Sequence, residues 1–181
     1  MNSDRIIDDT FNCINRVRTN PEEFVHTYGN ALGHYNGKIF RDRVKTREGD
    51  HALRDLLNDL RQRSALEKKL KWSFGLHMIA DQQARRLAQF DLVTTEDHEC
   101  HQTLPQRVKD FAIVKGRISE VTEFGGESGE EITEWLLIDD GLTSRKRRRT
   151  LLDPEFQYIG IGSYMHETHG VVTVIILAED V

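Results

Sequence analysis

Residues 171–177, VVTVIIL, constrain the fold more than any other part of this chain. The run is almost entirely β-branched and apolar, which predicts a central strand buried on both faces of a sheet. Upstream, residues 156–162 combine aromatic and β-branched side chains with two glycines, a pattern typical of a strand that another segment approaches closely. The turn around residues 167–170 separates the two runs, so residues 156–164 and 171–178 are predicted to pair as a hairpin.

Helical periodicity dominates the residues that precede this hairpin. Apolar spacing predicts helices over residues 4–25, 48–63, 73–88, 105–111 and 130–138 and a short strand over residues 118–122. Ser73 is expected to cap the third of these helices. Residues 26–47 are expected to form a polar surface loop that its short apolar patch, Ile39-Phe40, holds against the protein. Pro21 makes continuation of the first helix awkward, and a second helix could restart there with Asn20 as its cap. Helices followed by strands predict an α+β fold, with helices packed on a mainly antiparallel sheet. A chain of 181 residues suits one domain, 1–181.

Composition narrows the classes of partner and compartment. The net charge of −5 argues against a polycation built to bind nucleic acid. Two cysteines, Cys13 and Cys100, are too few for a disulfide framework. The amino terminus shows no signal peptide, and no apolar run approaches the roughly 20 residues of a transmembrane helix. We therefore expect an intracellular protein, either cytoplasmic or part of a cytoskeletal or organellar structure.

A turn followed by a basic run forms the most distinctive local pattern. The sequence Asp139-Asp140-Gly141 ends a helix-compatible segment, and five cations follow at residues 145–149. Lys and Arg clusters contact acidic proteins or anionic lipids, so this basic patch is a candidate partner site; its members are Arg145, Lys146, Arg147, Arg148 and Arg149. No aromatic residue interleaves the run, which disfavours nucleic acid. The acidic residues of 127–140 are expected to form a solvated helix face or to pair with these cations.

Three motifs in order resemble the CAP superfamily, which comprises cysteine-rich secretory proteins, antigen 5 and plant pathogenesis-related proteins. The first is N-x-x-R-x-x-P-x-x-F from Asn15, and the second is L-x-W-x-x-x-L-x-x-x-A-x-x-x-A from Leu70. The third is W-L-x-x-D-D-G-x-x-S-R-x-x-R from Trp135, followed by L-x-x-x-F-x-x-I-G-I-G from Leu152. The resemblance implies a three-layer α-β-α sandwich with a cavity, lined by two histidines and one or two acids, that can bind a divalent metal.

The resemblance also implies which residues line this cavity. The first histidine corresponds to His98, although its loop is shorter and lacks the family's glycines, and the acid of the E-N-I motif corresponds to Glu120. The second histidine is replaced by Arg147, whose guanidinium would repel a metal ion. We therefore predict a vestigial cavity with no metal, no cofactor and no catalysis, in which Arg147 pairs with Glu120 or, alternatively, points into solvent.

Two further groups of histidine and cysteine residues could bind a metal ion or take part in catalysis. Residues 97–101, DHECH, gather His98, Cys100 and His101, which could form half of a zinc site or a Cys-His nucleophile pair. His166 and His169 show metal-ligand spacing, but they lie in the predicted hairpin loop, where solvated polar residues are expected.

The preferred function is a non-catalytic interaction or structural module, contributing to a larger cytoskeletal, flagellar or organellar assembly. The alternative is a CAP module that binds lipid, sterol or an acidic membrane. A metal-dependent hydrolase is the third hypothesis.

Overall fold

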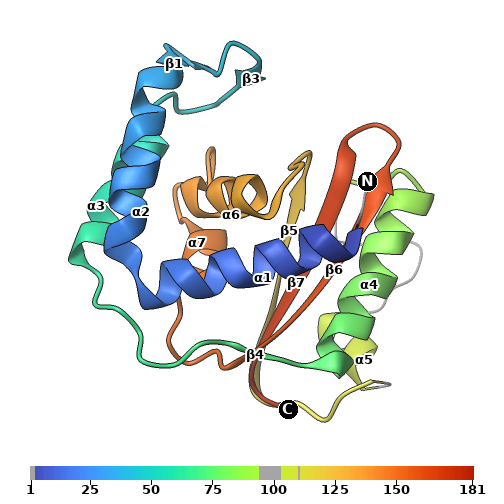
Figure 1. The fold of residues 1–181 in the computed structure, drawn as a ribbon. Coiled ribbons are helices and arrows are strands. Elements are labelled where there is room, and N and C mark those ends of the chain that lie inside the picture. Colours follow the sequence, from blue (N-terminus) through green and yellow to red (C-terminus); the bar gives the residue numbers. More distant parts are fainter. Residues whose placement is uncertain (1–2, 94–102, 110) are drawn as a thin grey trace.

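The computed structural model describes residues 3–93, 103–109 and 111–181, which form helices around a central sheet (Figure 1). The α-helices are α1 (Ser3–Thr19), α2 (Pro21–Gly29), α3 (His51–Gln62), α4 (Phe74–Gln89), α5 (Leu104–Val108), α6 (Gly129–Ile138) and α7 (Lys146–Leu151). A 3₁₀ helix, η1 (Asn30–His34), follows α2. Three two-residue strands, β1 (Tyr35–Asn36), β2 (Ile39–Phe40) and β3 (Val44–Lys45), make a small antiparallel sheet.

The central sheet has the order β4-β6-β7-β5. Its strands are β4 (Lys71–Trp72), β5 (Lys115–Phe124), β6 (Tyr158–His166) and β7 (Gly170–Asp180). The predicted hairpin is confirmed: β6 and β7 are antiparallel, and Ile161 lies opposite Ile175. Strand β5 also pairs antiparallel with β7, whereas β4 runs parallel to β6. The sheet is therefore mainly antiparallel, with β7 buried between two neighbours, as its continuous apolar sequence predicts.

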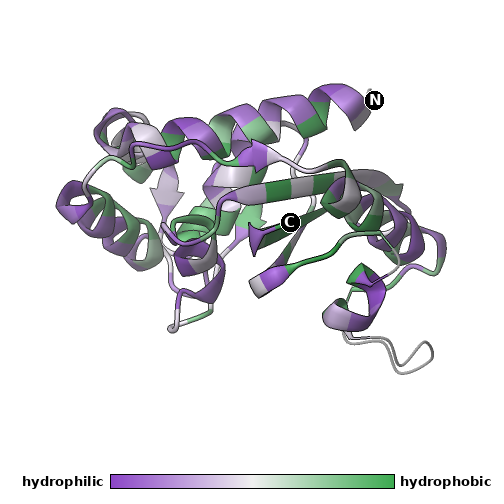
Figure 2. Cartoon of the chain, turned by 90° about the horizontal axis from the view of Figure 1, so that it is seen from below, coloured by the Kyte–Doolittle hydropathy of each residue, from purple (hydrophilic) through white to green (hydrophobic). Residues whose placement is uncertain are grey.

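Alternate residues of β7 enter different cores, because side chains of a strand point to opposite faces in turn. Val171, Ile175 and Leu177 join a core formed with α1, α2, α3 and α6. Val172, Val174 and Ile176 join a second core formed with α4 and α5. Figure 2 shows apolar residues along the central strands and polar residues on the outward turns of the helices. The result is the predicted three-layer α-β-α sandwich.

Two local predictions are wrong. Residues 26–47 are not an irregular loop, since they hold the end of α2, η1 and the small sheet. The expected anchoring of this segment is confirmed for Phe40, whose ring is buried, whereas Ile39 is exposed. The ring of Trp135 from α6 meets Phe40 edge to face at 5.4 Å, so a tertiary aromatic contact outweighs the polar local sequence. The long first helix is divided, and α2 restarts at Pro21 as the alternative reading proposed.

The first sequence motif holds the layers together. Asn15 of α1 accepts a hydrogen bond from the Leu70 main-chain N–H at 2.7 Å and donates to the Leu70 carbonyl at 3.4 Å. Arg18 donates to the main-chain carbonyls of Leu151, Asp153 and Phe156. Both side chains are buried. The motif thus joins α1 to the segments that lead into β4 and β6.

Candidate functional site: the cavity beside α7

The turn between α6 and α7 is organised by Asp139. Its backbone adopts a left-handed conformation, with φ of 53°, at the C-terminal cap of α6, and its side chain is fully buried. Its carboxylate accepts hydrogen bonds from the Arg147 main-chain N–H at 2.8 Å and from Arg147 Nε at 2.6 Å. Asp tolerates this conformation better than most residues. The turn therefore brings the start of α7 back onto the end of α6.

Arg147 lines a pocket of about 530 Å³ between the small sheet and the carboxyl end of β5. The other charged side chains around it are Arg43, Lys45, Glu123, Glu131 and Asp140. Arg43 bonds to Glu131 at 3.1 Å, and Asp140 accepts main-chain hydrogen bonds from Arg47 and Glu48. Arg147 and Arg43, two of the cations of this pocket, are already paired with acids of the chain, Arg147 with Asp139 and Arg43 with Glu131.

The predicted pairing of Arg147 with Glu120 is wrong. Glu120 forms an ion pair with Arg107 of α5 at 2.9 Å, and both side chains are nearly buried. The register explains the error: Glu120 lies opposite Ile176, which faces the α4 and α5 layer, so Glu120 and Arg147 lie on opposite faces of the sheet. The solvent alternative for Arg147 is also incorrect, because its side chain is only 29% exposed and pairs with Asp139.

Glu123 is the acid of β5 that shares the pocket with Arg147, and sequence analysis missed it. Its odd-numbered position points to the same face as Val121, which belongs to the core beneath α1 and α6. The carboxylate is buried and accepts a hydrogen bond from the Gly126 main-chain N–H at 3.1 Å. The signal was present in the sequence: if the predicted strand 118–122 is extended by one residue, the alternation of side chains places Glu123 on the same face as the apolar Val121.

Burial raises the pKa of Glu123 to about 7, because a carboxylate loses its hydration there, while Arg147 opposes this increase. The folded protein therefore holds this proton at pH values where the unfolded chain, with an ordinary pKa near 4.3, has released it. The contribution to stability is fully present below about pH 4.3 and is lost as the pH rises through about 7. Glu123 is thus a titrating group inside the candidate cavity.

The predicted basic patch is largely internal. Arg145 donates two hydrogen bonds of 2.6 and 2.7 Å to the Glu48 carboxylate and a third, of 2.9 Å, to the Asp55 carboxylate. Arg148 is 2% exposed and donates to Asp55 at 3.1 Å and to the carbonyls of Leu137, Ile138 and Ala52. These two arginines fasten α7 to α3 and to the end of α6, a role that the cation run alone did not indicate.

Only part of the run faces solvent. Lys146 and Arg149 are exposed, and neither makes an ion pair with a described residue. They border a shallow pocket of about 360 Å³ together with Arg117, which pairs with Asp153 and Glu179. The acidic residues of 127–140 were expected to be solvated, which is wrong for Asp139 and Glu134, because both are buried. The alternative expectation, that these acids pair with the cations of residues 145–149, is confirmed for Asp139, which pairs with Arg147.

Several candidate ligands lie outside the described residues, namely His98, Cys100 and His101. Within residues 3–93, 103–109 and 111–181, no group of three or more His, Cys, Asp and Glu side chains is arranged to hold a metal ion. His166 is buried rather than solvated, and its ring nitrogens contact the Leu92 carbonyl and the Asp91 carboxylate, each at 3.1 Å. Cys13 is a free, buried thiol. None of the described helices is long and apolar enough to cross a membrane.

The fold and the cavity define a class of protein: a three-layer α-β-α domain with a pocket between the last helices and the edge of the sheet. The model of the cysteine-rich secretory protein family, CAP, matches residues 54–177. This chain therefore belongs to the CAP family. No curated protein matches it.

Three solved structures to which this chain is similar come from bacteria. An extracellular protein with an SCP domain from Bacillus anthracis has a TM-score of 0.52 and 16% identity, over 70% of this chain and 40% of that one. An outer surface protein from Borrelia burgdorferi has a TM-score of 0.49 and 18% identity, over 88% and 94%. A cysteine-rich secretory protein from Staphylococcus aureus has a TM-score of 0.48 and 15% identity, over 71% and 38%. The chain thus spans under half of two of these three.

Proposed function

We propose that this protein is a non-catalytic CAP module that acts by contacting other macromolecules. The observation that supports this most is the ion pair between Arg147 and the buried Asp139, at 2.6 Å, beside Glu123. A guanidinium cannot ligate a metal, and its permanent charge opposes a divalent cation in the same pocket. The internal cation takes the position that the resemblance gives to a metal-binding histidine.

Zinc titration tests the loss of the cavity function. We expect the purified protein to bind no stoichiometric Zn²⁺ by calorimetry and elemental analysis, and to show no metal-dependent hydrolysis. An Arg147→His variant restores an imidazole beside Glu123 and should bind Zn²⁺ more strongly than the native protein. Stoichiometric zinc in the native protein would refute the proposal and revive the hydrolase hypothesis.

The contact surface is proposed to include Lys146 and Arg149, the two exposed cations of α7, and to accept an acidic protein segment. Charge reversal of both residues should weaken binding of a fluorescent poly-glutamate peptide and reduce its dependence on salt. A matched control reverses Lys38 and Lys115, which are exposed in the turn between β1 and β2 and at the start of β5, outside the two pockets beside α7, and which change the net charge equally. Equal weakening in both double variants would contradict a local site on α7.

The assembly proposal has its own test. A component of a larger structure should migrate well above its monomer mass in a native extract, and it should return to the monomer mass at high salt. A chain that stays monomeric in that extract would contradict the assembly role.

Membrane binding is the second candidate, and exposed apolar side chains near the start of α4 favour it. Phe74 is 70% exposed and Ile113 is 83% exposed, with Trp72 beside them on β4. Large apolar groups at a surface can enter the interfacial region of a bilayer. Sedimentation with vesicles containing phosphatidylserine should lose the protein from the pellet after Phe74→Ser and Ile113→Ser. Undiminished sedimentation of that variant would exclude this surface.

A further inference from the structure

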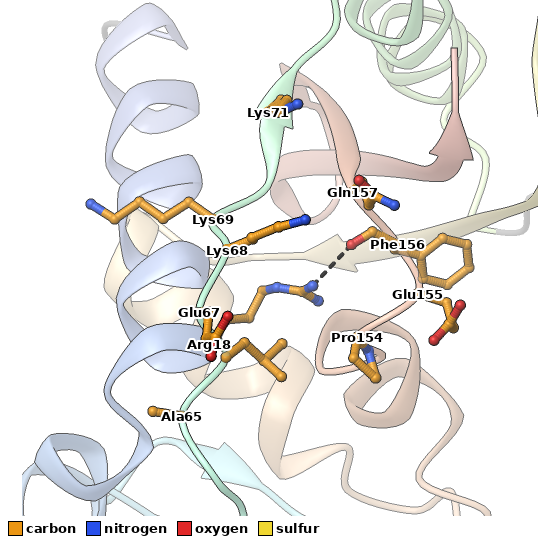
Figure 3. A pocket seen from close by; sticks show the side chains of 11 residues that line it. Arg18, Ala65, Glu67, Lys68, Lys69, Lys71, Pro154, Glu155, Phe156 and Gln157 are labelled. Atoms are coloured by element: carbon orange, nitrogen blue, oxygen red, sulfur yellow. Dashed lines mark hydrogen bonds between the residues drawn. The ribbon is translucent and has the colours of Figure 1, made fainter.

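A second pocket lies beyond the carboxyl end of α7, between the end of α1 and the segments that lead into β4 and β6 (Figure 3). It encloses about 590 Å³, a volume typical of small-molecule sites. Its walls are residues 65–71 and 154–157, and Arg18 lies between them. Neither the family's cavity residues nor the cations of α7 contribute to it.

Arg18 supplies a buried positive charge that no acid neutralises directly. The residue is 3% exposed, and its three hydrogen bonds of 2.6 to 2.9 Å go to uncharged main-chain carbonyls. Its Nε has no hydrogen-bond partner, and its guanidinium makes no ion pair, among the residues that the structure describes. Burial lowers the pKa of Arg18 to about 10, so the guanidinium stays protonated at neutral pH.

The lysines around Arg18 add to this charge. Figure 3 shows Lys68 extending across the pocket above the Arg18 guanidinium, toward the Phe156 carbonyl. Lys71 lies at the upper rim, whereas the side chain of Lys69 runs outward over α1. Because Lys69 points outward, Arg18, Lys68 and Lys71 are the cations that face the pocket, against two carboxylates, Glu67 and Glu155. The lining that faces the pocket is therefore net positive, which favours an anion.

The remaining lining favours an organic group on that anion. Ala65, Leu66 and Pro154 present apolar atoms next to the charged centre. Tethering α1 to the chain before β6 accounts for the three carbonyl contacts of Arg18, but it leaves the buried Nε of Arg18 without a hydrogen-bond partner among the described residues. A buried guanidinium loses its hydration, and a bound anion nearby would offset part of that cost.

We propose that this pocket binds a phosphate monoester with a small apolar or aromatic group. Lys68 and Lys71 contact the phosphate oxygens, the fixed charge of Arg18 attracts the dianion from beneath, and the apolar group lies against Leu66 and Pro154. This inference goes beyond the proposed function, because it concerns a different pocket and does not need a macromolecular partner.

Calorimetry with phenyl phosphate tests this site, with inorganic phosphate, benzoate and phenol as the comparison probes. We expect saturable binding of phenyl phosphate, weaker binding of inorganic phosphate and benzoate, and none of phenol. Lys68→Gln should weaken the binding of phenyl phosphate about tenfold, as expected for loss of one charge-assisted hydrogen bond. Lys69→Gln removes the same charge one residue away, from a side chain that points outward, and should weaken it less than threefold.

The outcomes separate cleanly. Equal losses in the two variants would show that general surface charge attracts the probe and would overturn the site. Binding of inorganic phosphate as tight as that of phenyl phosphate would overturn the apolar part of the proposal, and binding of benzoate as tight would overturn the preference for a dianion. Unchanged thermal unfolding of both variants confirms that they fold. Failure here leaves the zinc and poly-glutamate tests untouched, so the two proposals fail separately.

Discussion

Arg148 offers the sharpest test of the finding that the basic run is structural. Its side chain is buried, and it donates to the carbonyls of Leu137 at 2.5 Å and of Ile138 at 3.1 Å. These carbonyls belong to the last turn of α6, where the helix itself supplies no donors. Arg148→Met keeps a long apolar side chain and removes every donor, so both carbonyls and part of the Asp55 carboxylate lose a partner.

The magnitude follows from these lost contacts. Each buried acceptor left without a donor costs about 1–3 kcal/mol, and the methionine recovers part of this by packing. We expect the free energy of unfolding to fall by about 3 kcal/mol. For a chain of this length, the midpoint of thermal unfolding should then fall by roughly 6 to 12 °C. Arg149→Met, one residue along the same helix but exposed, should change the free energy by less than about 0.5 kcal/mol.

Guanidinium denaturation, followed by circular dichroism, measures both variants under the same conditions. If Arg148→Met matches the native protein within about 0.5 kcal/mol, the buried network contributes nothing and the reasoning is refuted. If Arg149→Met destabilises the protein equally, the effect comes from the composition of the helix and not from burial. A surface basic patch would predict small, similar changes at both positions.

Three further changes probe other contacts. Asp139→Asn keeps the left-handed turn but removes the charge that Arg147 faces, and should cost about 1–3 kcal/mol by chemical denaturation. Asn15→Ala leaves the Leu70 N–H unpaired and should cost about the same; a change below about 0.5 kcal/mol would deny it a structural role. Glu123→Gln removes the group with a raised pKa, so the variant should be more stable than the native protein at pH 8 and similar at pH 4; a constant difference across this range would contradict the burial argument.

The sequence predicts the layers of this fold well because its periodicities are strong. The run that forms β7 has no polar face, and the stripe of leucines in α3 is regular, so burial fixes both elements. Ser73 is correctly predicted as the cap of α4, because its hydroxyl accepts from the Leu76 N–H as in ordinary N-caps. Local chemistry is sufficient at such positions.

Charged residues were harder to place, because their partners are distant in the sequence. Arg145 and Arg148 pair with Glu48 and Asp55, 90 or more residues earlier, and no local pattern shows that α3 packs beside α7. The strands within residues 35–45 were missed for a related reason: each is two residues long, and the ring on α6 that packs against the expectedly buried Phe40 is distant in the sequence. A tertiary contact decides both cases, whereas periodicity reports only which face of an element is apolar.

The two acids of β5, Glu120 and Glu123, lie on opposite faces of the sheet and therefore have different partners. Aligning the acid of β5 by motif selects Glu120, whose face of the sheet belongs to α5 and Arg107. The pleat selects Glu123 instead, because Glu123 and Val121 point to the face of the sheet that α6 covers, and Glu123 lines the pocket beside α7. Motif position and strand geometry therefore disagree, and geometry determines which carboxylate meets Arg147.

This placement connects the turn, the cavity and the proposed loss of metal binding. Arg145 and Arg147 approach the end of α6 against Glu48 and Asp139, so each cation is matched by an acid within the chain. A metal entering beside Glu123 would meet the guanidinium of Arg147, which Asp139 holds in place through two hydrogen bonds. An acidic partner aimed at Arg145 would have to displace the bidentate Glu48 carboxylate. A metal ion would therefore be repelled by a guanidinium that is already held in place, and an acidic partner would compete with a carboxylate that is already bound. Lys146 and Arg149 have no such internal acid among the described residues, so they are the cations of α7 that a partner can reach most easily.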